Sequence, residues 1–339
     1  MRSYQYIPFL KENGFDVTVS PFFESSYLSQ LYYGENITKS LVIKNYLRRF
    51  FSLFSLYKYD LVIIEKELFP YFPAIIEQTL RFFKVKYIVD YDDALFHLYD
   101  QNSNKYIRKF LGNKIDIVMK NSSMVICGNV YLSERAKKAG AKKIKILPTV
   151  IDLKKYKRKT HYHKPSENIT IGWIGSPTTT NYLKLIEKSL LKIIKNFDVR
   201  ICIVGGVKGV LKNHKNISYI NWSEQEEIKT ILDFDIGIMP LNDADWAKGK
   251  CAYKIIQYMG CGLPVVSSRV GANIDVVDKG LSGFFATSQK EWEDSLSCLV
   301  QDFKLRTLLG DFGREKVTKE YSLEITSVKL LDYVNDLVL

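Results

Sequence analysis

The sequence predicts an α/β protein built from two doubly wound domains, and three observations support this. The chain has 339 residues, which is long for one such domain and suits two of roughly 150 residues. Short β-branched runs alternate with helix-length segments almost throughout, a pattern typical of parallel sheets covered by helices. A polar segment over 152–168 interrupts this alternation near the middle of the chain.

The N-terminal half begins with a predicted helix from Tyr4 that ends at a Gly14 C-cap. A doubly wound domain normally opens with a strand, so we expect the first strand of this domain to be missing. The following strands are predicted at 15–20, 60–65, 87–90, 123–127 and 145–147, and helices near 37–57, 72–83, 104–120 and 130–139. We place the N-terminal domain at 1–155.

The second alternating series follows Pro165, in a segment that resembles an interdomain linker. A capping-box pattern, Ser223 to Glu226, predicts the start of a helix. Strands are predicted at 169–174, 200–204, 217–220, 235–239, 264–266 and 283–285, and the chain closes with helices over 289–339. We place the C-terminal domain at 165–322 and a C-terminal helix at 323–339.

The charge is unevenly distributed along the chain. Residues 1–160 contain 27 Lys and Arg against 15 Asp and Glu, which accounts for the whole formal net charge of +12. A one-sided basic surface suits an anionic membrane face or another polyanion, although a Lys-rich composition also simply solvates a surface. The segment 41–58 mixes basic, aromatic and aliphatic residues, which fits a helix at a lipid headgroup boundary or an ordinary buried helix. No nucleic-acid reading motif accompanies the charge.

The cysteines indicate the compartment. There are five, an odd number, and they are widely spaced without a C-x-x-C pair. This pattern is typical of reduced thiols and argues against a disulfide framework or a zinc site. We therefore expect a cytoplasmic protein, with peripheral contact to the inner face of the plasma membrane as a further possibility.

Two glycine-rich turns follow predicted strands and are candidates for binding phosphate through backbone N–H groups. The first contains Gly175 and the hydroxyls of Ser176, Thr178 and Thr179, which would serve equally well as helix caps. The second contains Gly206. Because neither matches G-x-G-x-x-G or a P-loop, dinucleotide oxidoreductases and P-loop NTPases lose support.

Charged residues in two other places are candidates for chemistry. Lys250, Lys254 and Gln257 recur at helical spacing and would place two cations and an amide on one helix face, which is either functional or simply solvated. Asp92 and Asp93 end a predicted strand, where carboxylates meet a cation, a proton or sugar hydroxyls, or cap a turn. No second ligand cluster in the sequence supports a metal at this turn.

Residues 254–266, KIIQYMGCGLPVV, resemble the donor-site signature of family 4-type glycosyltransferases, K-x-x-E-Y-M-A-x-G-x-P-V-V. The turn at 172–176, the run 235–241, the segment 280–284 and the pattern from Arg314 to Ser322 follow in the family's order. The resemblance, to members of the bacterial surface-polysaccharide type, covers nearly the whole chain and is strongest over 169–325.

The resemblance implies a GT-B fold, in which two Rossmann-like domains face a cleft. It also implies transfer of a sugar from a UDP- or GDP-type donor to a lipid-linked or polysaccharide acceptor, with retention and without a required cofactor. Gln257 stands where a Glu usually binds the ribose hydroxyls, and Lys254 would meet the diphosphate. Asp92 and Asp93 would contact the transferred sugar or the acceptor, and Arg2 would face the acceptor side.

The chain departs from the family pattern at two places. Gly249 stands where many members have a first Glu, and the usual Arg and Lys after the first C-domain strand are absent. Lys250 and Lys254 would then supply the charge that a diphosphate leaving group needs. Two alternatives stay open: a non-catalytic or truncated GT-B protein, and a sugar-nucleotide epimerase, for which His97 is the best-placed histidine.

Overall fold

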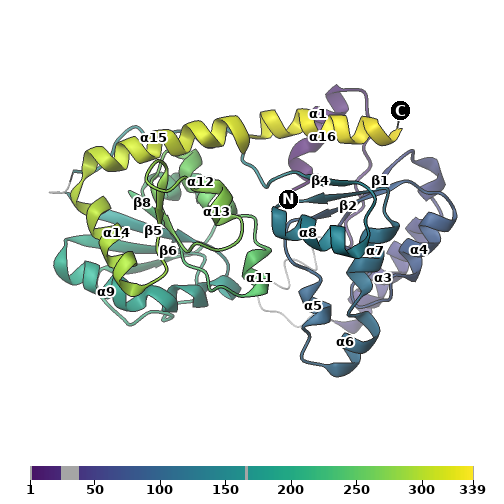
Figure 1. Cartoon of the computed structure of the whole chain (residues 1–339), viewed down its shortest axis with the longest axis horizontal. Coiled ribbons are helices and arrows are strands. Elements are labelled where there is room, and N and C mark those ends of the chain that lie inside the picture. The colour runs from purple at the N-terminus through teal and green to yellow at the C-terminus, as the bar shows by residue number, and fades with distance from the viewer. Residues whose placement is uncertain (1, 24–37, 165–166, 339) are drawn as a thin grey trace. The chain divides into compact units, whose positions relative to one another are not determined.

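The computed structural model describes residues 2–23, 38–164 and 167–338 (Figure 1). Contacts divide the chain into two compact units. Unit 1 comprises Met1–Leu147 with Ser327–Leu339, and unit 2 comprises Pro148–Thr326. The boundaries expected from the sequence are instead 155, 165 and 322.

The polar segment after Leu147 explains part of this difference. Lys159 Nζ donates to the carbonyl of Phe234 at 2.6 Å, and Tyr162 Oη donates to the carbonyl of Gly262 at 2.8 Å. Both anchoring side chains are buried. The described part of the predicted linker is therefore built into unit 2 and is not a free connection.

Unit 1 contains a parallel sheet in the order β1-β2-β3-β4. Its two inner strands are buried along their whole length, as expected where both faces of a parallel sheet are covered. The strands are β1 Val62–Glu65, β2 Tyr87–Tyr91, β3 Met124–Cys127 and β4 Ile144–Ile146. The helices are η1 Tyr4–Tyr6, α1 Ile7–Glu12, α3 Lys39–Leu53, η2 Leu56–Lys58, α4 Ile75–Phe82, α5 His97–Asp100, α6 Lys105–Leu111, α7 Lys114–Asn121 and α8 Val130–Ala139.

The start of unit 1 confirms one prediction and contradicts another. The first helix ends before Gly14, whose φ is +89° and which lets Phe15 N–H return to the carbonyl of Leu10 at 3.1 Å. The strand predicted at 15–20 is wrong, because that stretch belongs to no strand. Within the described residues of unit 1, the first strand is β1.

The last helix, α16 Leu323–Val338, closes unit 1 through its C-terminal turns. Lys86 Nζ donates to the carbonyl of Leu337 at 2.7 Å, and Lys143 Nζ lies 3.0 Å from Asp336 Oδ2. These contacts join residues that are far apart in sequence, and they explain why the end of the chain groups with its beginning.

Unit 2 contains a six-stranded parallel sheet in the order β10-β9-β8-β5-β6-β7. This is a doubly wound order whose direction switches between β5 and β8, and such sheets bind ligands outside the carboxyl ends of the strands at that point. The strands are β5 Ile169–Ile174, β6 Val199–Val204, β7 Ile217–Ile220, β8 Ile236–Met239, β9 Val265–Ser267 and β10 Gly283–Phe285. The helices are η3 Pro177–Ile186, α9 Glu187–Asn196, α10 Glu227–Leu232, α11 Asp245–Lys248, α12 Tyr253–Gly260, α13 Asn273–Val276, α14 Gln289–Gln301 and α15 Phe303–Glu320.

Helices cover both faces of the unit 2 sheet (Figure 1). Trp173 of β5 belongs to one apolar cluster with Leu190 of α9 and Leu296 of α14. Facing the other way, Tyr258 of α12 lies over Gly237, where an added Cβ would come within 2.4 Å of its ring. Tyr258 Oη also accepts the N–H of Ile174 at 2.9 Å. These contacts place α12 directly beside the switch point.

The charge asymmetry is smaller in the folded units than along the sequence. Unit 1 holds 23 Lys and Arg against 16 Asp and Glu, and unit 2 holds 26 against 21, giving +7 and +5. The basic run 154–159 carries five cations, and it belongs to unit 2. Both units are therefore basic.

Two arginines of the 41–58 segment donate to backbone carbonyls of the chain before α3. Arg48 donates to the carbonyls of Pro21 and Phe22, both at 2.8 Å. Arg49 donates to the carbonyl of Ser20 at 2.7 Å and lies 5.7 Å from the Phe22 ring centroid. Burial lowers the pKa of Arg49. These two side chains anchor the chain before α3.

Candidate functional site

Three glycines form the edge of unit 2 where β5 and β6 end. A Cβ on Gly175 would lie 2.4 Å from the Trp173 ring and 2.8 Å from Lys254 Cε, and a Cβ on Gly205 would lie 2.2 Å from the carbonyl oxygen of Gly175. Gly205 has a φ of +71°, and a Cβ on Gly206 would lie 2.6 Å from Ile203. Only glycine fits here, so the backbone itself forms this surface.

The hydroxyls after Gly175 organise the first turn of η3. Ser176 N–H donates to Thr179 Oγ1 at 3.2 Å, and the hydroxyl oxygens of Ser176 and Thr178 are 2.9 Å apart. Ser176 and Thr178 are nevertheless exposed. Thr180, the next hydroxyl of this turn, accepts the N–H of Val207 at 3.2 Å and joins the two glycine turns. The predicted hydroxyls thus combine a capping role with an accessible surface.

The two lysines occupy different structures. Lys254 lies on α12, is half-buried, and places its Nζ 5.5 Å from the Trp173 ring centroid, which is within cation–π range. Lys250 precedes the helix, because α12 begins at Tyr253 after Ala252, whose φ is +51°. The prediction that Lys250 shares one helix face with Lys254 and Gln257 is therefore wrong.

Gln257 is buried and faces a hydrogen-bond network. Its Nε2 donates to Glu227 Oε1 at 2.6 Å and to Tyr156 Oη at 2.7 Å. Tyr156 Oη also donates to Glu227 Oε1 at 2.6 Å, and Trp222 Nε1 donates to Glu227 Oε2 at 2.6 Å. Burial, followed by the nearby Tyr253 and Glu227, raises the pKa of Tyr156. Both N–H bonds of the Gln257 amide are therefore engaged.

Sequence reasoning missed the central member of this network. Glu227 is the first residue of α10, one residue after the predicted capping box. That capping box is wrong, since Ser223 Oγ lies 3.3 Å from Gln225 Oε1 and Glu226 makes no side-chain cap. The only signal that could have indicated Glu227 was an acidic cluster after a strand, which by itself points to nothing.

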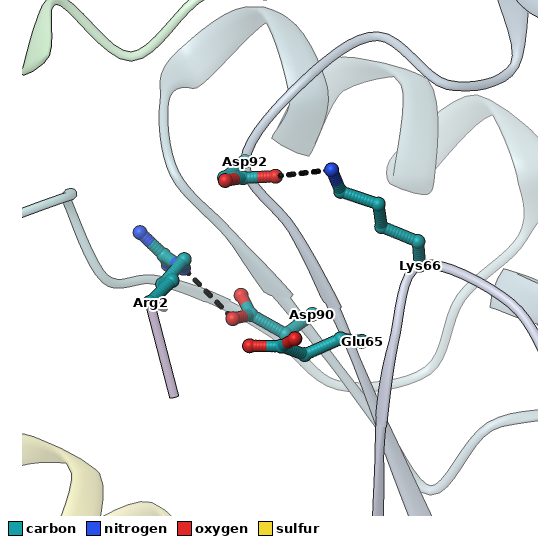
Figure 2. Close-up of a pocket in the computed structure, with 5 residues that line it drawn as sticks. All are labelled: Arg2, Glu65, Lys66, Asp90 and Asp92. Carbon is teal, nitrogen blue, oxygen red and sulfur yellow. Dashed lines mark hydrogen bonds and ion pairs between the residues drawn. The ribbon is translucent and has the colours of Figure 1, made fainter. Parts of the chain in front are cut away.

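In unit 1, a polar hollow of about 70 Å³ lies at the carboxyl ends of β1 and β2. Figure 2 shows the five side chains that line it: Arg2, Glu65, Lys66, Asp90 and Asp92. Arg2 is buried, with Nε donating to Asp90 Oδ2 at 2.7 Å and Nη2 donating to the carbonyl of Leu147. The hollow thus contains the residue predicted for the acceptor side and one of the two predicted catalytic aspartates.

The aspartates of this turn have distinct surroundings. Asp92 is about one-third exposed and lies 3.5 Å from Lys66 Nζ. Asp93 Oδ1 accepts the N–H of Ala94 at 3.0 Å and so caps its own turn. Asp90, which the sequence analysis did not select, is buried, and within the described residues its Oδ1 has no hydrogen-bond partner. Burial raises the pKa of Asp90 although Arg2 opposes the shift.

His97 packs away from this hollow. Its Nδ1 lies 2.8 Å from Asp100 Oδ1 and its Nε2 lies 2.8 Å from Tyr131 Oη. Arg135 in turn lies 3.0 Å from Asp100 Oδ2. Both ring nitrogens of the buried His97 are therefore engaged by neighbouring side chains. The histidine that an epimerase would have used as an acid or base does not line this hollow.

Comparisons with known proteins agree with this architecture. Residues 168–302 match the family model described as glycosyl transferases group 1. A glycosyltransferase structure from Rickettsia africae is 14% identical, with a TM-score of 0.70 over 99% of this chain and 94% of that chain. Anabaena HepE, solved with UDP and glucose, is 15% identical, with a TM-score of 0.68 over 97% and 88%.

A third solved structure, sucrose-phosphate synthase from Thermosynechococcus elongatus, is 14% identical, with a TM-score of 0.68 over 89% of this chain and 80% of that chain. A search of curated protein sequences finds no match. At these identities the structural likenesses establish the fold, and the predicted α/β class with two Rossmann-like sheets is confirmed. Residues 168–302 match the glycosyl transferases group 1 model, and the chain has the GT-B fold of these solved structures.

Proposed function

We propose that the chain is a retaining hexosyltransferase that moves a sugar from a UDP- or GDP-type donor to a lipid-linked or polysaccharide acceptor. The observation that carries the proposal is the carboxyl edge of unit 2, where three glycines, exposed hydroxyls and Lys254 meet at the switch point of a doubly wound sheet. HepE, with the same fold, was solved with UDP and with UDP-glucose. These likenesses favour a UDP-type donor.

In this proposal unit 2 holds the nucleotide sugar. Backbone at Gly175, Gly205 and Gly206 lets the diphosphate approach closely, as glycine turns do in other phosphate sites. Ser176 and Thr178 offer hydroxyl donors to phosphate oxygens. Lys254 and Lys250 stabilise the negative charge that develops on the leaving diphosphate, the role that a metal ion plays elsewhere. We therefore propose a reaction without a required metal or other cofactor.

Unit 1 is proposed to bind the acceptor through its polar hollow. Asp92 is the carboxylate best placed to meet a sugar or acceptor hydroxyl, since it lines the hollow and is partly exposed. Asp93 shapes the turn that carries it, and Arg2 acts indirectly by holding Asp90. The hollow is small, at about 70 Å³, and we propose that it receives one polar group of the acceptor.

A donor screen tests the proposal. Purified protein is mixed with UDP-, GDP- and dTDP-sugars while thermal unfolding and sugar-nucleotide hydrolysis are followed. One nucleotide class should raise the melting temperature, by an amount that grows with the logarithm of its concentration. The anomeric configuration of the transferred sugar, read by proton NMR, tests retention. A chain that neither binds nor hydrolyses any of these donors would be a non-catalytic GT-B protein.

A second proposal concerns the cytoplasmic face of an anionic membrane. No helix within the described ranges is long and apolar enough to span a bilayer. One face of α3 and the turn after it is instead exposed and apolar, at 46–67% exposure, through Ile43, Leu47, Phe50, Phe51 and Phe54. Lys44 and Lys58 are also exposed on this segment. An apolar stripe flanked by lysines suits a headgroup boundary.

Vesicle binding tests the second proposal. The protein should sediment with phosphatidylglycerol vesicles more than with phosphatidylcholine vesicles, and added salt should weaken the binding. The variant Leu47→Glu/Phe51→Glu should lose most of the binding, since it places charge within the stripe. The matched variant Leu185→Glu/Leu308→Glu changes exposed residues of unit 2 and should retain it. Equal binding by both variants would contradict the proposal.

A further inference from the structure

We propose that Glu227 of α10 is the side chain that recognises the ribose hydroxyls of the donor, with Gln257 as the residue that positions it. The inference rests on the proposed function, because it assumes that a nucleotide occupies the edge of unit 2. It differs from the expectation that Gln257 itself binds the ribose.

The position of Glu227 follows from a closed ring of contacts around the carboxyl edge of the sheet. Gly205 lies against Gly175 and also against Trp222, whose Cβ would be 3.1 Å from an added Cβ on Gly205. Trp222 then donates to Glu227, and Glu227 accepts from Gln257. Gln257 lies one turn of α12 after Lys254, whose Cε returns the ring to Gly175. Glu227 is therefore the acidic member of the ring that surrounds the proposed diphosphate surface.

The hydrogen-bonding capacity of Glu227 leaves room for a ligand. An ionised carboxylate offers about four lone-pair sites. Oε1 accepts from Gln257 and Tyr156, and Oε2 accepts from Trp222. Within the described residues, these bonds leave acceptor capacity on Oε2, and the side chain is only partly buried. Ribose hydroxyls are donors, and a carboxylate is the group that commonly accepts them in doubly wound nucleotide sites.

Gln257 has the opposite properties. It is 2% exposed, and its amide group donates both of its N–H hydrogen bonds, one to Glu227 and one to Tyr156. A glutamate at position 257 would bring a second carboxylate to within 2.6 Å of Glu227 Oε1, where like charges repel strongly. The carboxylate of Glu227 therefore favours an uncharged amide, and not a second carboxylate, at position 257. Gln257 is the positioning residue, and Glu227 carries the charge that a ligand can reach.

The first test compares the affinities of UDP and 2′,3′-dideoxy-UDP, measured by calorimetry. Wild-type protein should bind UDP about tenfold more tightly, because hydrogen bonds to a charged acceptor are lost with the hydroxyls. In Glu227→Gln this ratio should fall by roughly threefold or more, since a neutral acceptor forms weaker bonds. The control Glu226→Gln makes the same change one residue earlier, on a side chain that pairs with Lys229, and should keep the wild-type ratio.

A second measurement uses the unmodified protein, so it does not depend on the stability of a variant. The indole N–H of Trp222 donates to Glu227, and its NMR resonance can be assigned from its loss in Trp222→Phe. UDP should shift this resonance more than dideoxy-UDP does. An unchanged affinity ratio in Glu227→Gln, or equal shifts by the two nucleotides, would overturn the inference while leaving the proposed function intact. Failure of wild-type protein to bind any nucleotide would overturn both.

Discussion

The two polar sites of the molecule are built in opposite ways. At the edge of unit 2, glycines remove side chains and neutral donors converge on a single carboxylate, so the surface is held by hydrogen bonds. In the hollow of unit 1, three carboxylates gather at the ends of two strands, and two of them pair with cations, Arg2 and Lys66. The first arrangement suits an anionic ligand approaching the backbone, and the second suits a ligand that offers hydroxyls.

The difference has an energetic consequence. Lys254 at the edge of unit 2 is only half-buried, so its replacement should affect ligand binding before it affects stability. Unit 1 contains a buried charge pair, and removal of one partner of such a pair leaves an uncompensated charge. Changes at Arg2 should therefore affect stability first. The following variants test this contrast, beginning with the largest expected effect.

Arg2→Met should lower the free energy of unfolding by about 3–5 kcal/mol, because it leaves Asp90 buried without its cation. Urea denaturation at pH 7 measures this loss. The double variant Arg2→Met/Asp90→Asn removes both charges and should recover part of the stability. Lys66→Met removes the partly exposed partner of Asp92 and should change stability by no more than about 1 kcal/mol. A loss for Lys66→Met as large as that for Arg2→Met would contradict the contrast.

Lys254→Met should lower kcat by about 100-fold with the best donor, because a cation near the leaving diphosphate acts mainly in the transition state. Steady-state kinetics give the value, and the melting temperature should change little. Lys290→Met, on an exposed cation of α14 that pairs with Asp294, serves as the control. If kcat is retained in Lys254→Met, the leaving group is stabilised by other residues.

Alanine variants of two glycines with positive φ distinguish the cost of backbone strain from that of a clash with a neighbouring carbonyl. Gly205→Ala would place its Cβ 2.2 Å from the carbonyl of Gly175, whereas Gly209→Ala meets nothing within 4 Å. Gly209→Ala should cost about 1 kcal/mol of stability through strain alone and retain nucleotide affinity. Gly205→Ala should lose nucleotide affinity by roughly tenfold or more, as measured by calorimetry. Equal affinities of the two variants would remove the glycine turn from the donor site.

The pH dependence of unfolding gives the smallest effect. Burial raises the pKa of Asp90 in the folded state, so the folded protein holds this proton to a higher pH than the unfolded chain does. Stability contributed by this group is therefore present below the usual Asp value of about 3.9 and falls as pH rises above it. Asp90→Asn removes this titration. Its stability should decline less steeply than that of wild type between pH 4 and pH 7, and a steeper decline would contradict the assignment.

Sequence patterns predicted helices and strands well where neighbouring residues alone determine the element. Strand β5 and helix α8 have the predicted bounds, 169–174 and 130–139, because each is an uninterrupted pattern bounded by turn residues. The stretch 15–20 has the same alternation but no partner strand, and β-propensity is realised only through pairing. The switch point between β5 and β8 depends on strand order, which periodicity does not contain.

The candidate sites were predictable only in part. The glycines and Lys254 were found because they lie within contiguous motifs. Glu227 meets Gln257 across 30 residues, and Arg2 meets Asp90 across 88 residues. Such contacts depend on the packing of whole elements, so one sequence alone gives no indication of them. The left-handed conformation of Ala252 similarly delays the start of α12 to Tyr253 and separates Lys250 from Lys254.

Hydrogen exchange with and without UDP tests most directly the central claim that a nucleotide sugar binds at the edge of unit 2. The account predicts slower exchange over 175–180, 205–209 and 220–227 and around α12, with little change in the hollow of unit 1. Protection confined to unit 1, or bound UDP without protection of the glycine turns, would contradict it.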